Sequence, residues 1–180
     1  MPRVTKVQKA RRSPGNCSSC GVKIEIGQPY FWWQFAFAPK SIRCALHPPA
    51  PKDLTRSAFH STLLGIQEED FTGPSDSSEL ESLRDDVVSQ LEDLKSEIEG
   101  NLSNMPDSLQ QGSTGELLQE RIDALDEVIS NLQGVDCSVA AEDEQPADEE
   151  GEEDREAQIT ERLTEIADEL TSILGDVSCS

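Results

Sequence analysis

Two short stretches decide the fold of this chain: residues 17–21 read CSSCG, and residues 44–47 read CALH. Each stretch places two metal-ligating side chains two residues apart, and 23 residues separate the two pairs. This spacing lets both side chains of a tight turn point toward one ion, and four thiolate or imidazole ligands complete the tetrahedral shell of a structural zinc site. We therefore predict one structural Zn²⁺ bound by Cys17, Cys20, Cys44 and His47.

A redox pair is the alternative interpretation of the first stretch, but a thioredoxin-like site needs a surrounding βαβ pattern that this sequence lacks. Four protein ligands leave no open position for a catalytic water, so the predicted zinc is structural. Glu25 is the only acid between the two pairs, and His60 is expected on a helix surface rather than as a fifth ligand.

No nucleophile triad or phosphate-binding glycine loop is recognisable. We expect a protein that is not an enzyme, with a nuclease component as the enzymatic alternative.

Charge divides the 180 residues into two opposite parts. Residues 1–60 hold ten Lys/Arg against two acids, a net charge of +8, whereas residues 61–180 hold five against 34, a net charge of −29. All eight aromatic residues lie at or before Phe71.

Five cysteines, an odd number, indicate a reducing compartment more than a set of disulfides. No apolar run is long enough to cross a bilayer. We expect a cytoplasmic protein, in a bacterial or a host cytoplasm.

The basic part predicts a disordered basic arm over residues 1–15 and a zinc-binding head over residues 16–71. Alternation and turn residues predict strands over 23–26, 30–37 and 41–45, followed by a short helix that Asp53 would cap. One face of the longest strand is expected in the core and the other outside it. The expected core side chains are Phe31, Trp33, Phe35 and Phe37, packed against Leu54, Phe59, Leu63 and Ile66.

Exposed aromatic rings beside Lys and Arg are typical of nucleic-acid binding, because bases stack on rings and cations neutralise phosphates. We therefore consider DNA or RNA as a partner of residues 1–60. For Trp32 two interpretations remain: its ring contacts a ligand at the surface, or it packs under the N-terminal arm. The candidate nucleic-acid-binding residues are Arg3, Lys6, Lys9, Arg11, Arg12, Tyr30, Trp32, Lys40 and Arg43.

The acidic part predicts two amphipathic helices within residues 72–140, an acidic linker over 141–153 and a C-terminal amphipathic helix within 154–180. Apolar residues spaced by three or four place the helices at about 78–99, 115–132 and 154–174. Residues 120–127 align with residues 161–168 at an offset of 41. Cys137 and Cys179 follow the two repeated helices, either as incidental thiols or in a redox or dimer-forming role. The apolar residues form a stripe along each helix, and such stripes would allow residues 78–174 to associate with a second copy of the chain or with another helical protein.

Several blocks carry a resemblance to known families. The pattern CxxCGxxIxxGxxY over residues 17–30 resembles the opening of treble-clef fingers and, more loosely, the zinc finger of poly(ADP-ribose) polymerases, whose second pair has the order His-x-x-Cys. The chain more closely resembles a family of uncharacterised bacteriophage proteins. The blocks that carry this resemblance are YFWWQF (30–35), HPP (47–49), DLTRS (53–57), NMPDSLQQ (104–111) and GELLQER (115–121). This resemblance indicates where the protein comes from rather than what it does, because the family has no established activity.

The expected fold is a small α+β zinc-stabilised head, with a zinc-ribbon or treble-clef-like hairpin plus a short helix, followed by acidic amphipathic helices with disordered linkers. The leading hypothesis is a non-enzymatic phage-type adaptor with a nucleic-acid-binding head and an associating tail. The alternative is a protein-interaction module whose acidic tail mimics nucleic acid or shields the head, with no direct nucleic-acid binding. Neither hypothesis involves a membrane.

Overall fold

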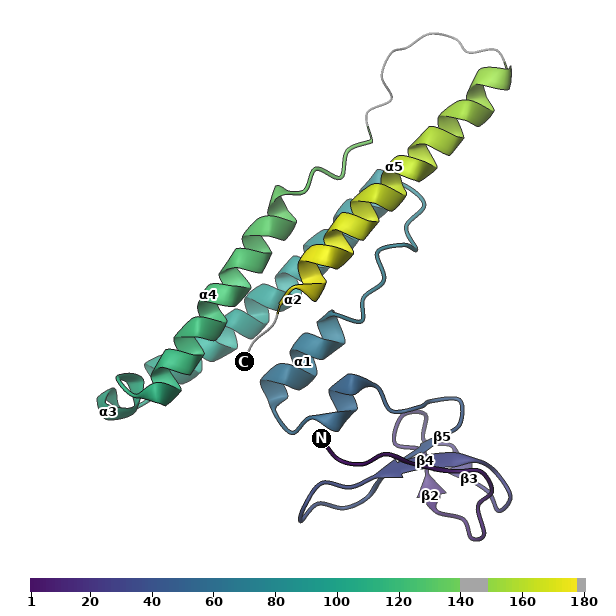
Figure 1. Ribbon diagram of the computed structural model, residues 1–180, viewed down its shortest axis with the longest axis vertical. Coiled ribbons are helices and arrows are strands. Elements are labelled where there is room, and N and C mark those ends of the chain that lie inside the picture. Colours follow the sequence, from purple (N-terminus) through teal and green to yellow (C-terminus); the bar gives the residue numbers. More distant parts are fainter. Residues whose placement is uncertain (140–148, 178–180) are drawn as a thin grey trace. The chain divides into compact units, whose positions relative to one another are not determined.

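The computed structural model describes residues 1–139 and 149–177; for residues 149–156 it describes the backbone alone. The chain is mixed α+β and forms two compact units (Figure 1). We call Met1–Leu64 the head and Gly65–Ser180 the tail. Among the described residues, all strands belong to the head and all long helices belong to the tail.

The head contains two small antiparallel sheets. One has three strands in the order β1-β4-β5, and the other pairs β2 with β3. In the larger sheet Phe31 lies between Lys6 and Arg43, and Trp32 lies between Thr5 and Ile42. The strands are β1 (Thr5–Val7), β2 (Gly15–Asn16), β3 (Lys23–Ile24), β4 (Tyr30–Trp33) and β5 (Ser41–Cys44).

The N-terminal segment differs from the predicted disordered arm over residues 1–15. Strand β1 pairs with β4, and the backbone of Ala10 bonds in both directions, accepting from Gly27 at 2.8 Å and donating to Gln28 at 3.0 Å. Ala10 is 2 % exposed. The physical reason is that β4 would otherwise leave its backbone donors and acceptors unpaired on this side. The basic residues of this segment are therefore carried on an ordered edge of the head.

Strand β4 is shorter than the sequence predicted, because the chain leaves the sheet after Trp33. The N–H of Ala38 donates to the carbonyl of Phe35 at 3.2 Å, and Phe37 has a φ of 62°. Of the four rings expected in the core, only Trp33 is buried; Phe31 and Phe35 are half-buried and Phe37 is fully exposed. The alternation of buried and exposed side chains holds only within β4, because the turn after Trp33 changes the direction in which each following side chain points.

The predicted helix after Asp53 is in fact two elements, a 3₁₀ turn η1 (Pro51–Leu54) and helix α1 (Ala58–Ile66). Asp53 does not cap α1. Its carboxylate accepts from the Ala50 N–H at 2.8 Å and from the Arg43 guanidinium at 2.6 Å. Ser57 takes the capping role, because its hydroxyl accepts from the His60 N–H at 3.3 Å.

The tail contains the three predicted helices, each longer than expected, together with a short one that was not predicted. Residues 149–153 of the predicted acidic linker lie inside α5, and its residues 141–148 fall outside the described part of the chain. The first long helix begins at a cap in which Asp76 accepts from the Glu79 N–H. The helices are α2 (Ser77–Ser103), α3 (Asp107–Gln110), α4 (Ser113–Gly134) and α5 (Glu149–Gly175).

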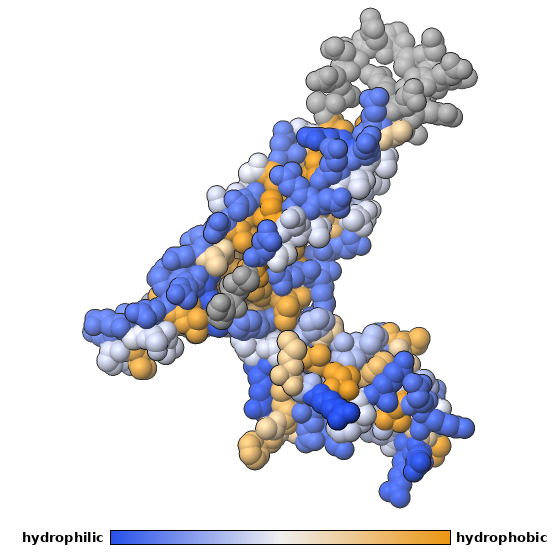
Figure 2. All heavy atoms as spheres, viewed as in Figure 1, coloured by the Kyte–Doolittle hydropathy of each residue, from blue (hydrophilic) through white to orange (hydrophobic). Residues whose placement is uncertain are grey.

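The apolar stripes of the long helices face one another within the chain. Helix α2 packs along α4, and both contact α5. Figure 2 shows the apolar residues in the seam between these helices and polar residues over their outer faces. The repeated segments occupy equivalent positions, since Leu125 and its counterpart Ile166 are both buried. The fully buried contributors are Leu80, Val87, Leu91, Leu125, Leu132 and Leu170.

Polar contacts fix the ends and the register of these helices. Lys95 of α2 binds Asp126 of α4 at 2.5 Å, and Gln67 donates to the carbonyl of Leu174 at the end of α5 at 3.0 Å. A Cβ at Gly115 would lie far inside van der Waals distance of the Gln110 carbonyl. Glycine is therefore required where α3 meets α4.

Candidate metal centre

The four predicted ligands come together at one end of the larger sheet. One ligand atom from each of Cys17, Cys20, Cys44 and His47 lies within 4.8 Å of all the others. Around a tetrahedral zinc with bonds of about 2.0–2.3 Å, ligand atoms lie about 3.5–3.8 Å apart. A small contraction of the cluster would therefore bring it to that geometry. This group could hold a metal ion.

The first pair of ligands sits on a tight turn that its glycine permits. The Gly21 N–H donates to the Cys17 carbonyl at 2.9 Å, and the Cys17 N–H donates to the Val22 carbonyl at 2.9 Å. Gly21 has a φ of 71°, a left-handed conformation that a side chain would strain. The backbone thus closes around Cys17 and turns Cys20 back toward it.

The second pair is positioned by the end of β5. Cys44 is the last residue of that strand, and the His47 N–H donates to the Cys44 carbonyl at 3.1 Å. The His47 Nδ1 atom lies 3.2 Å from the Cys44 sulfur. The two turns are joined directly, because the Ser18 N–H donates to the Ile42 carbonyl of β5 at 2.8 Å. The ligand pairs are therefore held together by backbone contacts as well.

Backbone N–H groups stabilise the thiolate form of one ligand. Burial acts to raise the pKa of Cys17, but hydrogen bonds from the backbone of Cys20, Cys44 and Ser19 outweigh it and lower the pKa to about 6. For Cys20 a backbone hydrogen bond from Val22 lowers the pKa, yet desolvation and the neighbouring thiols leave it raised. Since a metal binds the thiolate, Cys17 is the ligand already prepared for it at neutral pH.

The chemistry of the donors suits a soft or borderline metal. Three sulfurs and one imidazole form a Cys₃His set, which is common in structural zinc sites. These three cysteines are free thiols with no disulfide between them. Cys17 is buried, whereas Cys20 is exposed, so the cluster opens to solvent on the Cys20 side. His60 does not belong to this group, and its ring packs edge-on against Phe59 at 5.1 Å.

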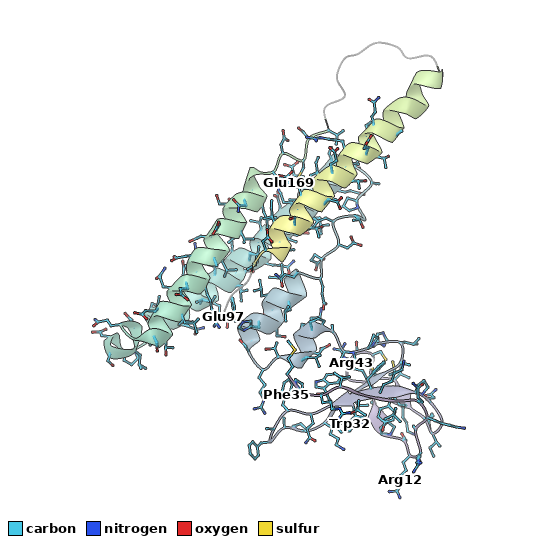
Figure 3. The ribbon with its side chains drawn as sticks, viewed as in Figure 1. Arg12, Trp32, Phe35, Arg43, Glu97 and Glu169 are labelled. Carbon is cyan, nitrogen blue, oxygen red and sulfur yellow. The ribbon has the colours of Figure 1, made fainter. Side chains whose placement is uncertain are left out.

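The predicted nucleic-acid residues are spread over the head and are not all available. Arg3, Lys9, Arg11 and Arg12 are exposed, and Figure 3 shows Arg12 extending away from the sheet. Arg43, in contrast, is half-buried and paired with Asp53. Tyr30 is half-buried at the start of the central strand β4, opposite Cys44. Lys6 and Lys40 are exposed as well, so the exposed cations among the predicted residues are the five of the N-terminal segment together with Lys40.

Three aromatic rings of the head each have a cation over one face. The Lys6 ammonium lies 5.5 Å from the centre of the Phe31 ring, and the Lys40 ammonium lies 4.5 Å from that of Trp32. In the third pair the Arg56 guanidinium lies 5.4 Å from the Phe35 ring. None of the three pairs was predicted from the sequence. Each distance is within the range of a cation–π contact. Trp32 therefore pairs with the N-terminal strand along its backbone while its ring contacts Lys40.

The sequence did not mark Arg56 as a residue of this aromatic surface, and it assigned Phe31, Phe35 and Phe37 to the core instead. Nothing in the pattern marks Arg56, because its partner ring lies about twenty residues earlier in the chain. Phe37 could have been suspected from the Ala38-Pro39 step after it, since proline at this place indicates a turn rather than a continuing strand.

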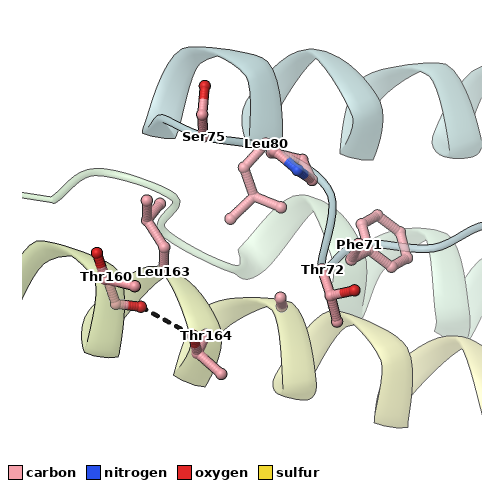
Figure 4. Close-up of a pocket in the computed structure, with 9 residues that line it drawn as sticks. Phe71, Thr72, Ser75, Leu80, Thr160, Leu163 and Thr164 are labelled. Atoms are coloured by element: carbon pink, nitrogen blue, oxygen red, sulfur yellow. Dashed lines mark hydrogen bonds between the residues drawn. The ribbon is translucent and has the colours of Figure 1, made fainter.

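Cys137, the remaining thiol among the described residues, lies in the tail, as does a cavity beside the start of α2. Another cavity, of about 370 Å³, lies in the head and is lined by Cys20, Cys44 and His47. Cys137 is buried, and Arg84 donates to its sulfur at 3.6 Å and to the Val135 carbonyl at 2.9 Å. Desolvation raises the pKa of Cys137, which disfavours the thiolate form that reacts. Cys179, near the corresponding end of the second repeat, lies outside the described residues. A cavity of about 280 Å³ opens between the start of α2 and α5 (Figure 4). Its lining, which includes Phe71, carries no titratable side chain.

The chain matches no family model, no curated protein and no solved structure. The resemblance to phage proteins therefore stays a prediction from the sequence. Among the described residues, no helix combines the length and the apolar character that crossing a membrane requires.

Proposed function

We propose that the protein is a non-enzymatic adaptor whose zinc-stabilised head binds nucleic acid and whose helical tail offers an acidic outer surface to a partner protein, since its apolar stripes are already buried within the chain. The observation that carries this proposal is the set of three cation-capped rings on the head, at Phe31, Trp32 and Phe35. Such rings and cations side by side are what stacking on bases and neutralising phosphates require.

Zinc supports this proposal by giving a small basic surface a fixed shape. The Cys₃His donor set favours Zn²⁺, and its four protein ligands leave no position for a catalytic water. A thiolate site also suits a reducing compartment, which makes the cytoplasm the proposed location. Residues 26–52 contain no acid, so the segment that carries Trp32, Phe35 and Lys40 has no negative side chain of its own to repel a phosphate.

Binding of labelled single- and double-stranded DNA and RNA by the full chain tests the proposal. We expect affinity that falls steeply with salt, because each neutralised phosphate releases counterions. Lys40→Ala removes the cation over Trp32 and should weaken binding and reduce the salt slope, whereas Lys23→Ala, on an exposed lysine paired with Glu25, is the matched control. Absence of any salt-sensitive binding would overturn the nucleic-acid role.

A specific feature also favours the alternative function. The helices of the tail turn a dense acidic surface to solvent, on which Glu97 and Glu169 are exposed (Figure 3). Such a surface resembles the charge of a nucleic acid and could shield the basic head. In that case residues 1–66 alone would bind nucleic acid much more tightly than the full chain, with metal content confirming that the fragment is folded. Equal affinities would exclude shielding by the tail.

A further inference from the structure

The turn between β4 and β5 presents one aromatic side chain to solvent without any packing. Phe37 is 107 % exposed, and the loop that carries it extends beyond the sheet in Figure 1. A phenyl ring in water gives no folding energy, because that energy comes from removing apolar surface from solvent. The stability of the head therefore does not account for a phenylalanine at this place.

The backbone at this residue is also unfavourable for phenylalanine. Phe37 has a φ of 62°, and it is the only residue other than glycine with a positive φ in the part of the chain that the structure describes. Bulky side chains rarely adopt this conformation, and such outliers concentrate where a side chain is held for binding. The ring is thus both exposed and held in a strained position.

Side chains from both sides of the loop hold the turn in place. The Gln34 amide donates to the Ala38 carbonyl at 2.7 Å, and the Arg56 guanidinium donates to the Ala36 carbonyl while it lies over the Phe35 ring. These contacts fix the carbonyls on either side of Phe37. The ring is therefore presented on a braced turn rather than on a free loop.

We propose that Phe37 is a base-stacking residue, whose ring stacks on an unpaired base of single-stranded DNA or RNA. This inference rests on the proposed nucleic-acid function of the head. The charge of the turn favours that ligand, since Arg56 and Lys40 flank it and residues 26–52 contain no acid. An unpaired base offers a free face to a protruding ring, whereas the bases of a duplex are already stacked on each other.

Two strands of equal length separate stacking from phosphate contact: an intact single-stranded oligonucleotide and one in which every base is replaced by an abasic site. The full chain with bound zinc is titrated against each, with fluorescence anisotropy as the readout. Phe37→Gly should weaken binding of the intact strand by roughly 5- to 100-fold and leave binding of the abasic strand unchanged. Phe37→Trp should keep the affinity, and Ile26→Ala, at another exposed apolar residue of the head, is the control.

Three results would overturn the inference. If Phe37→Gly binds the intact strand as tightly as the original chain, stacking by Phe37 is wrong while the nucleic-acid function of the head stands. If the original chain binds neither strand, both proposals fall together. If Phe37→Gly loses affinity only for vesicles of anionic lipid, the ring contacts a membrane instead. Metal content and tryptophan emission report whether each variant keeps the fold.

Discussion

In the head, only five apolar side chains are buried, whereas each long helix of the tail contributes a stripe of its own to a continuous core. The five are Ala10, Cys17, Ile24, Trp33 and Leu63, and one of them is a metal ligand. A core this small is marginal without a disulfide or a metal. From this difference we expect the same chain to use two sources of stability, a metal in the head and an apolar core in the tail, so that one could be removed without the other.

The largest expected effect separates the two units through a single ligand. Cys44→Ser removes one of the four metal-binding groups, and metal binding to such sites contributes on the order of 10–16 kcal/mol of folding free energy. We expect the head to lose its metal and unfold while the tail helices persist. Metal analysis measures the loss, and Cys137→Ser, at a thiol outside the metal group, is the matched control. A variant that keeps a full equivalent of metal would contradict the ligand assignment.

A substitution in the tail should have the opposite pattern. Leu125 is completely buried, so Leu125→Ala should lower the free energy of unfolding of the tail by about 2–5 kcal/mol. Thermal unfolding followed at 222 nm measures this loss, while metal content should not change. Leu109→Ala, at a half-exposed leucine of α3, is the control and should have little effect. Loss of metal in Leu125→Ala would show that the two units are not independent.

A smaller effect in the tail tests the close approach between α3 and α4. Gly115→Ala places a methyl group against the Gln110 carbonyl, so the backbone must shift, at a cost of about 1–3 kcal/mol. Gly100→Ala is the matched control because nothing lies near that position; there we expect a gain of about 0.5–1 kcal/mol. Urea unfolding of both variants gives the two values, and equal changes would contradict the proposed packing.

The smallest expected effect concerns the exposed turn of the head. Phe37→Gly relieves the left-handed backbone, whose strain is about 1–2 kcal/mol, and the greater freedom of glycine in the unfolded chain offsets part of this gain. We expect the head to become more stable by up to about 1 kcal/mol. Urea unfolding followed by tryptophan emission measures it. A clear loss of stability would mean that the ring contributes to folding after all.

The metal group was predictable from the sequence because its spacing is local. Two residues between ligands determine the turn, and Gly21 permits it, so Cys17, Cys20, Cys44 and His47 could be named before their geometry was known. The tail helices were predictable for a similar reason, since residues such as Leu91 and Leu125 recur with the helical period. These features depend on neighbours that are close in the sequence.

The features that escaped prediction depend on contacts distant in the sequence. Whether residues 1–15 form a strand is decided by the open edge of β4, which the basic composition does not reveal. Arg43 has the charge of a phosphate ligand, but Asp53 occupies its guanidinium. Phe37 continues the alternating pattern of the strand, yet the turn that redirects it is fixed by Gln34 and Arg56. Local pattern does not contain these partners.

Removal of the metal from the full chain tests the central claim most directly. Both tryptophans, Trp32 and Trp33, lie in the head, so tryptophan emission reports on the head, while ellipticity at 222 nm reports mainly on the helices of the tail. With a strong zinc chelator we expect one equivalent of zinc to be released and the emission to shift to the red as Trp33 is exposed. The helical ellipticity should be nearly unchanged. An unchanged emission after complete metal release, or a collapse of both signals together, would contradict the account.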